Sequence, residues 1–328
     1  MIAPSEFAWD FEVCELYNTA VEKKDQESIN AMFRELHESC INPQNNNKVT
    51  KRKRPEEEAL RSSVRQSEGA FRYKEIVVKK HTNYMQFVLV PNPSKQNSLT
   101  IEAMKELKDA FLLAKRDSNC KAVLLNSSGS YFCSGIDLSQ LIGANKKQAA
   151  DEMATTIKDL VITLGHFTKP VIAAVNGTTI GFGVSLLTFC DVILASDKAT
   201  FSIPATRLGY LPEGGITLTL PQLVGAGVAT EMLLHGRRLT AEQALRHGLV
   251  SEVLWPTHLM NEVMPRIQTI VSQPLSVMET LKSMVRCHLW DKLKSHLERE
   301  CRLLPPFWLD AQCQHNIKRT LQTGWLVD

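Results

Sequence analysis

The sequence lacks the patterns that would indicate a metal site, a disulfide framework or a membrane span. Its eight cysteines include no Cys-x-x-Cys pair, and its nine histidines include no His-x-x-x-His pair. Such close spacings are typical of bound zinc. No apolar run approaches the roughly 20 residues that a membrane-spanning helix needs. We therefore expect a soluble, metal-free protein from a reducing compartment.

A strong excess of charge is absent as well. The 328 residues carry 38 Lys and Arg against 35 Asp and Glu, a formal net charge of +3. This balance gives no general argument for binding nucleic acid. Early acidic residues such as Glu6 and Asp10 are untypical of a signal peptide or presequence, and residues 325–328 are no Ser-Lys-Leu-type address. We expect an intracellular protein that contacts neither nucleic acid nor membrane directly.

Composition changes along the chain and predicts three segments. Residues 1–41 place apolar residues at helical spacing, which predicts a helical N-terminal extension. This extension is either a partner-binding hairpin or an appendage of the main domain. Residues 42–70 have few apolar residues and predict a disordered basic linker. Residues 71–328 are expected to form the main domain.

The linker contains one compact basic run followed by an acidic one. The run consists of Lys51, Arg52, Lys53 and Arg54. A short cluster of this kind in an accessible segment predicts a nuclear import signal. The alternative is a solvated charge cluster of the linker.

Strand and helix signals alternate in the main domain. Residues 100–115 place apolar side chains at helical spacing and predict a helix. Apolar, β-branched runs predict strands at residues 76–78, 87–90, 123–125, 171–175 and 192–195. Repeated strand-then-helix order predicts an α/β fold with a largely parallel sheet covered by helices.

Two glycine-containing turns follow predicted strands. The first is the segment 133–137, with Gly135 at its centre. The second begins after Asn176-Gly177 and leads through Gly181-Phe182-Gly183 into an apolar segment, 184–189, that predicts a buried helix. Backbone N–H groups at such turns can hold a developing oxyanion. One turn of this kind is usually structural, whereas the pair in this order is more specific.

These turns belong to a series of motifs that resembles the crotonase (enoyl-CoA hydratase/isomerase) superfamily between about residue 72 and residue 328. The series comprises residues 92–99, 132–137, 169–183, 190–201, 208–215, 236–244 and 248–250. The resemblance implies a crotonase spiral of ββα units with a helical C-terminal region that covers the site or mediates trimerisation. It also implies a homotrimer with a coenzyme A thioester as ligand or substrate and no other cofactor.

The resemblance implies two donors for the oxygen of a thioester enolate, the backbone N–H groups of Ile136 and Phe182. Many hydratases have glycine at the position of Phe182, but any residue except proline supplies the N–H. The candidate residues for binding coenzyme A are Lys95, Ser134, Gly135 and Asp137. For Lys95 the alternative is a solvated loop position, and for Asp137 it is a side chain that fixes the turn.

The base is where the chain departs from the hydratase pattern. Ser185 and Ala205 stand at the positions of the two hydratase glutamates, so hydration is not expected. Glu213 lies in a Pro-Glu-Gly segment similar to that of peroxisomal-type Δ3,Δ2-enoyl-CoA isomerases, in which one glutamate takes a proton from C2 and returns it at C4. Burial would raise its pKa and suit both steps. The alternative is that Glu213 caps a helix beginning near Gly214.

Two branches of the superfamily remain open. Residues 71–80, 284–287 and 298–301 are similar to chromodomain Y-like transcriptional corepressors, although no chromodomain pattern is visible. We predict a nuclear protein of this type, a corepressor or scaffold with an acyl-CoA pocket and with chromatin-regulatory proteins as candidate partners. The alternative is a Δ3,Δ2-enoyl-CoA isomerase of fatty-acid oxidation in the peroxisome or mitochondrion, with Glu213 as its single acid and base.

Overall fold

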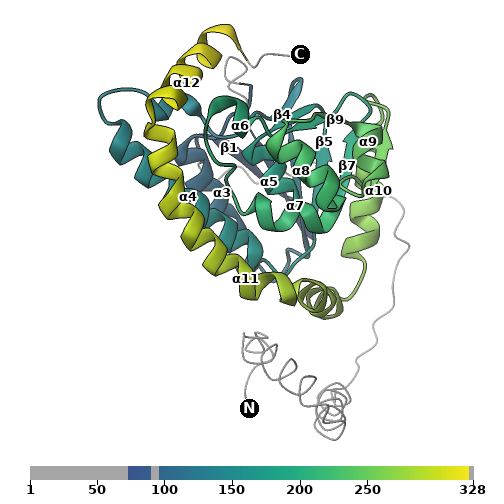
Figure 1. Ribbon diagram of the computed structural model, residues 1–328. Coiled ribbons are helices and arrows are strands. Elements are labelled where there is room, and N and C mark those ends of the chain that lie inside the picture. Colours follow the sequence, from purple (N-terminus) through teal and green to yellow (C-terminus); the bar gives the residue numbers. More distant parts are fainter. Residues whose placement is uncertain (1–72, 90–95, 325–328) are drawn as a thin grey trace, which may run out of the picture. The chain divides into compact units, whose positions relative to one another are not determined.

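The computed structural model describes residues 73–89 and 96–324. Two β-sheets lie at the centre of the fold (Figure 1). The larger sheet has the order β1 (Ile76–Lys80), β2 (Tyr84–Leu89), β3 (Ala122–Ser127), β5 (Val171–Val175), β7 (Val192–Ser196) and β10 (Glu252–Leu254). The smaller sheet has the order β4 (Tyr131–Cys133), β6 (Thr178–Ile180), β8 (Thr200–Ser202) and β9 (Leu239–Thr240).

The strands alternate between the two sheets in a repeating pattern. The pairs β1–β2 and β8–β9 are antiparallel, and the other pairs in both sheets are parallel. The first unit, β1 and β2, adds both strands to the larger sheet. From β3 to β8, each unit adds one strand to the larger sheet and one to the smaller sheet before a helix follows. The units end in α4 (Lys146–Gly165), α5 (Phe182–Leu187) and α6 (Ala205–Leu208). The predicted spiral of ββα units is confirmed.

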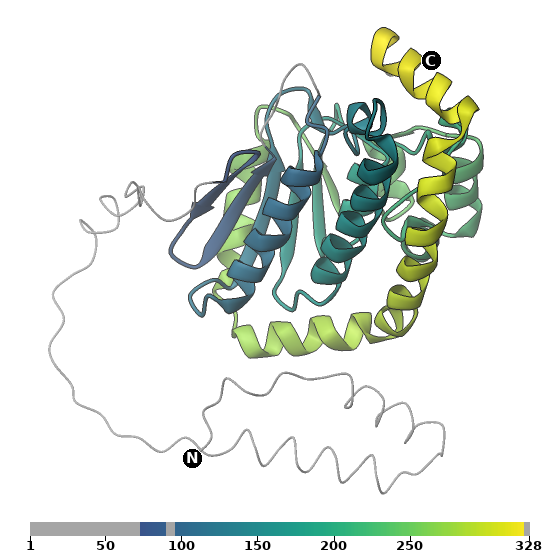
Figure 2. The same ribbon diagram turned by 90° about the vertical axis from the view of Figure 1, so that its left-hand side faces the viewer.

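The central strands of the larger sheet, β3 and β5, are buried on both faces. One face is covered by α3 (Ile101–Arg116) and α4 (Figure 2). Val123 and Leu125 of β3 belong to the core on that side. Ala122 and Leu124, which alternate with them, pack against α10 (Leu259–Val271) on the other face. Burial on both faces explains why β5 is an unbroken apolar run rather than an alternating one.

The predicted helix at residues 100–115 corresponds to α3. Thr100 precedes it, and its side chain accepts a hydrogen bond from the backbone N–H of Ala103. The strands that were expected from apolar runs are also present. β2 begins at Tyr84, three residues before the expected start at Phe87, because residues 84–86 pair with the neighbouring strands β1 and β3.

The C-terminal region is helical, as expected. The remaining helices are η3 (Leu138–Leu141), α7 (Ile216–Val224), α8 (Ala226–Leu234), α9 (Ala241–Arg246), α11 (Leu275–Leu309) and α12 (Ala311–Thr323). α11 runs beside α4, also touches α7, and changes direction along its length (Figures 1 and 2). Gly165 permits the close approach of α4, because a Cβ there would lie 2.4 Å from Cζ3 of Trp290 on α11.

Several predicted features lie outside the described residues. These are the N-terminal extension, the whole basic linker with Lys51–Arg54, and Lys95. All described residues belong to one unit, residues 66–328. Within them, no helix combines the length and the apolar character that crossing a bilayer would require.

Candidate active site

The two predicted oxyanion turns lie side by side. They follow β4 and β6, which are parallel neighbours in the smaller sheet, so their carboxyl ends meet at one edge. Gly135 has φ +92°, and a Cβ built on it would lie 3.1 Å from the carbonyl oxygen of Ile180 and 3.5 Å from the backbone nitrogen of Phe182. Glycine at position 135 therefore permits the close contact between the turns.

The N–H of Ile136 points away from the neighbouring segment that contains Leu99. Leu99 and Ile136 form an isolated parallel bridge. In it, the N–H of Leu99 donates to Gly135 at 2.8 Å, and the N–H of Asp137 donates to Leu99 at 2.9 Å. Successive peptide groups of an extended segment face opposite sides. The bridge therefore directs the N–H of Ile136 to the side opposite Leu99.

Phe182 is the first residue of α5. Gly181 precedes it with φ 54° and ψ −121°, and the first N–H groups of a helix have no acceptor within the helix. The Phe182 side chain is fully buried. A Cβ built on Gly214 would lie 2.7 Å from its Cε2 atom, so the ring packs directly against the segment that carries Glu213.

Glu213 lies in the loop between α6 and α7, against the second turn. Its side chain is 2% exposed, and its Oε1 atom has no hydrogen-bond partner among the described residues. A Cβ built on Gly181 would lie 3.6 Å from that atom. Burial raises the pKa of Glu213 to about 8, with a further contribution from Glu300, while the backbone N–H groups of Glu213 and Phe182 oppose the rise.

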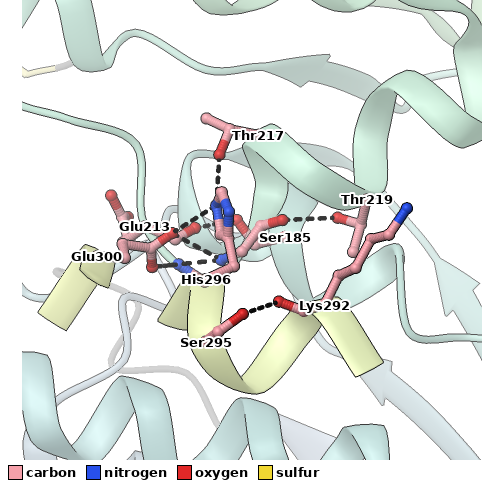
Figure 3. Close-up of polar contacts among 10 residues, drawn as sticks. Ser185, Glu213, Thr217, Thr219, Lys292, Ser295, His296 and Glu300 are labelled. Carbon is pink, nitrogen blue, oxygen red and sulfur yellow. Dashed lines mark hydrogen bonds and ion pairs between the residues drawn. The ribbon is translucent and has the colours of Figure 1, made fainter. Parts of the chain in front are cut away.

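Glu300 binds the backbone of the loop that leads into α7. The N–H of Gly214 donates to Oε1 of Glu300 at 2.6 Å, and that of Gly215 donates to Oε2 at 3.0 Å (Figure 3). These residues directly precede α7, whose own cap residue provides no side-chain bond. Burial raises the pKa of Glu300 to about 7, and the two N–H groups oppose this. The interpretation of Glu213 as a helix cap does not describe the structure.

The charge of the two carboxylates is not balanced nearby. Among the described residues, neither Glu213 nor Glu300 forms an ion pair with a lysine or arginine. The nearest cationic candidate is His296, whose Nε2 lies 4.0 Å from Oε2 of Glu300 and 2.8 Å from the hydroxyl of Thr217 (Figure 3). Burial lowers the pKa of His296, with a further contribution from Arg299, so the ring is neutral at neutral pH.

Ser185 and Ala205, which stand at the two positions of the hydratase glutamates, have structural surroundings. The hydroxyl of Ser185 donates to the backbone carbonyl of Glu213 at 2.6 Å, and Ala205 is buried at the start of α6. Cys133, beside the first turn, is fully buried, and burial raises its pKa to about 12. Its thiol is therefore no nucleophile at neutral pH. Glu213 is the carboxylate that faces the two turns.

The remaining predicted binding residues have observed structural surroundings. Ser134 is buried, and Asp137 begins η3. The Oδ1 atom of Asp137 accepts hydrogen bonds from the N–H and the hydroxyl of Ser139, at 3.0 Å and 2.5 Å. This is the turn-fixing role. Contact of Ser134, Gly135 and Asp137 with coenzyme A stays a prediction. Within the described chain, no three or more His, Cys, Asp or Glu side chains gather as a metal site would require.

Sequence reasoning missed the role of Glu300, although a signal was present. Leu293, Leu297 and Leu304 form the buried stripe of the C-terminal half of α11. Glu300 continues this stripe at helical spacing and is itself only 8% exposed. A glutamate on the apolar face of an amphipathic helix indicates a buried carboxylate with a specific partner.

Known proteins resemble this chain in both sequence and fold. Human Chromodomain Y-like protein is 41% identical over 275 residues, which are 83% of this chain and 46% of that protein. Enoyl-CoA delta isomerase 2 of Rattus norvegicus is 35% identical over 223 residues, 67% of this chain and 57% of that protein. The chain thus spans about half the length of these relatives.

A solved structure agrees with these relatives. An enoyl-CoA hydratase from Mycobacterium avium subsp. paratuberculosis K-10 matches with a TM-score of 0.69 and 28% identity, over 74% of this chain and 98% of that chain. The family pattern described as Enoyl-CoA hydratase/isomerase covers residues 81–323. The chain therefore belongs to the enoyl-CoA hydratase/isomerase family and has the crotonase fold.

Proposed function

We propose that this chain binds an acyl-CoA thioester at the two turns and acts in the nucleus as a corepressor or scaffold of the chromodomain Y-like type. One observation supports the binding part above the others. The Gly135–Ile136 and Gly181–Phe182 turns adjoin, and a buried carboxylate with an unpartnered oxygen lies against the second. Two converging N–H groups suit a thioester carbonyl, whose oxygen gains negative charge when a proton leaves C2.

The regulatory part of the proposal depends on similarity. The 41% identity to human Chromodomain Y-like protein covers 83% of this chain. In this proposal Lys51–Arg54 direct nuclear import, the chain assembles as a homotrimer, and its partners are chromatin-regulatory proteins. Replacing the four basic residues by alanine and imaging the full chain tests the import signal. Loss of nuclear accumulation is the expected result, and unchanged localisation removes the main support.

A second candidate, Δ3,Δ2-enoyl-CoA isomerisation, is favoured by the surroundings of Glu213. In this reaction the Glu213 carboxylate takes a proton from C2 of a 3-enoyl-CoA. The N–H groups of Ile136 and Phe182 stabilise the dienolate oxygen, and protonated Glu213 returns the proton to C4. A pKa of about 8 suits a group that must accept and release the same proton near neutral pH. As an enzyme of fatty-acid oxidation, the protein would work in the peroxisome or mitochondrion.

One pair of measurements separates the two candidates. Calorimetry with a non-hydrolysable thioether analogue of an acyl-CoA measures binding, and conversion of a 3-enoyl-CoA to its 2-enoyl isomer measures turnover. Glu213→Gln is the test variant, and Glu298→Gln, an exposed position on α11, is the control. Binding without turnover in the wild type supports the binding module. Turnover that only Glu213→Gln abolishes supports the isomerase, and the absence of binding contradicts both.

A further inference from the structure

Glu213 and Glu300 are buried together although they come from distant parts of the chain. Glu213 is 2% exposed and Glu300 is 8% exposed. Glu300 binds the N–H groups of the two residues that directly follow Glu213, at 2.6 Å and 3.0 Å. We propose that Glu300 is a positioning residue of the active site: it fixes the loop that carries Glu213 and places a second negative charge beside it. This proposal deepens the proposed function, on which it rests.

The first half of the proposal follows from the backbone of the loop. Gly214 and Gly215 both have positive φ, 84° and 71°. Two consecutive residues in this region expose their N–H groups on one side, and such a concave arrangement favours an anion. The Glu300 carboxylate occupies that place. It thereby holds the turn that directs the Glu213 side chain toward Gly181. A Cβ built on Gly181 would lie 3.6 Å from Oε1 of Glu213.

Most helices are capped by a residue of the preceding turn. Here no side chain caps α7 in this way, and the N–H groups of its cap residue Gly215 and of Gly214 bind a buried carboxylate from α11 instead. A serine nearer in sequence would satisfy the same N–H groups without placing a charge against Glu213. The arrangement therefore does more than end a helix. It couples the C-terminal region to the candidate base.

The second half concerns the electrostatic surroundings of Glu213. Its titratable neighbours are Glu300 on α11, Tyr210 in the loop after α6 and Cys133 on β4. Burial raises the pKa of Tyr210 and that of Cys133, so both stay neutral. His296, which faces Glu300 from the preceding helical turn, is neutral as well because its pKa is lowered. Among the described neighbours of Glu213, Glu300 is thus the one that carries negative charge near neutral pH. With a pKa of about 7 it is partly ionised there and fully ionised at higher pH, and its charge favours protonated Glu213.

The test reads the charge of Glu213 directly and needs no turnover. Carboxyl-¹³C glutamate is incorporated into the full chain, and the resonance of Glu213 is identified by its absence from Glu213→Gln. The coupled wild-type pair is expected to titrate in two steps. In Glu300→Gln we expect one step, with the midpoint of Glu213 lower by about one pH unit. Glu298→Gln, on the exposed face of the same helix, is expected to leave the titration unchanged.

A folded Glu300→Gln protein with the wild-type midpoint overturns the proposal. If this variant does not fold, Glu300→Asp takes its place, because it keeps the charge but withdraws it by one methylene. In Glu300→Asp, a fall in the titration midpoint of Glu213 by less than one pH unit supports the proposal, and an unchanged midpoint overturns it. Turnover is measured separately. A wild type without isomerase activity counts against the isomerase alone, whereas in an active protein the rise of kcat/KM with pH should move to lower pH in Glu300→Gln.

Discussion

The two halves of α11 contribute charged groups to two clusters that differ in balance. In the N-terminal half, Lys282 and Arg286 pair with Asp191, at 2.7 Å and 2.9 Å. Asp191 also accepts the N–H of Val171, and Lys282 donates to the carbonyl of Lys169. The two cations share the Asp191 carboxylate, and each also donates to a backbone carbonyl. This cluster joins α11 to the ends of the central strands.

The C-terminal half contributes Glu300, which lies beside a second carboxylate and pairs with no lysine or arginine in the part of the chain that the structure describes. The pKa of Glu213 is raised to about 8 and that of Glu300 to about 7. Oε1 of Glu213 has no hydrogen-bond partner among the described residues. Buried polar groups are usually satisfied, so a buried carboxylate oxygen without a partner, beside the turn at Gly181, makes Glu213 a candidate for chemistry or binding. One helix thus carries a stabilising cluster and a destabilising one.

The largest effect expected from this contrast is on the pH dependence of stability. A carboxyl whose pKa is raised in the folded state binds its proton more tightly there, so stability present below its ordinary pKa of 4.5 is lost as the pH rises to about 8. At about 1.4 kcal/mol per pKa unit, Glu213 alone should lower the free energy of unfolding by roughly 3 kcal/mol between pH 5 and pH 8. Urea unfolding at both pH values measures the total fall, to which the raised pKa of Glu300 also contributes. Glu213→Gln should make the fall clearly smaller by removing the share that belongs to Glu213.

Glu298→Gln is the control for this measurement, because it removes an exposed carboxylate from the same helix. It should keep the wild-type slope of stability against pH. A Glu213→Gln protein whose stability falls with pH as steeply as that of the wild type would show that Glu213 ionises as easily in the folded chain as in the unfolded one. The contrast between the two clusters would then not hold.

Removing a carboxylate from the other cluster should act in the opposite direction. Asp191→Asn leaves Lys282, with a side chain 8% exposed, without its counter-ion. We expect a loss of about 2 kcal/mol in the free energy of unfolding at pH 7, below the full value for a buried pair because Asp191 is partly exposed. Urea unfolding at fixed pH measures it. An unchanged or increased stability would mean that the ionic cluster does not hold α11.

Local signals predicted the sheet and the turns, but not the relation between distant segments. The apolar run 171–175 had to be a buried strand, and Gly135 and Gly181 indicated turns because each stands where a strand gives way to a new element. Glu213 was identified by its Pro-Glu-Gly segment. None of these signals depends on where another part of the chain passes.

The role of Glu300, in contrast, depends on where a distant part of the chain passes. Its partners, Gly214 and Gly215, are 85 or more residues away in sequence, and the contact exists only because α11 passes the start of α7. The stripe of Leu293, Leu297 and Leu304 predicts burial of this face but names no partner. The sequence likewise assigned helix capping to Glu213 as an alternative, because local spacing cannot show that a remote carboxylate already occupies the N–H groups.

A pair of glycine substitutions sharpens the comparison at the loop. Gly214 and Gly129 have almost the same φ, 84° and 83°, but a Cβ on Gly214 would meet the Phe182 ring at 2.7 Å, whereas a Cβ on Gly129 meets nothing within 4 Å. Both alanine variants bear the cost of positive φ. Gly214→Ala should lose about 1–2 kcal/mol more, because the ring must move. Thermal unfolding measures the difference, and equal losses would show that the ring does not pack tightly against the loop.

The smallest expected effect tests whether burial, rather than pairing itself, gives the Asp191 cluster its strength. Lys105 and Glu152 form an ion pair at the same 2.7 Å as Lys282 and Asp191, but their side chains are 43% and 44% exposed. Solvent screening and side-chain entropy reduce such a pair to at most about 0.5 kcal/mol. Glu152→Gln should therefore change the free energy of unfolding by no more than that, and 1 M salt should remove the change. A loss as large as that of Asp191→Asn would show that the geometry of an ion pair, and not its burial, sets its contribution to stability. Burial of the Asp191 cluster would then not explain how α11 is held.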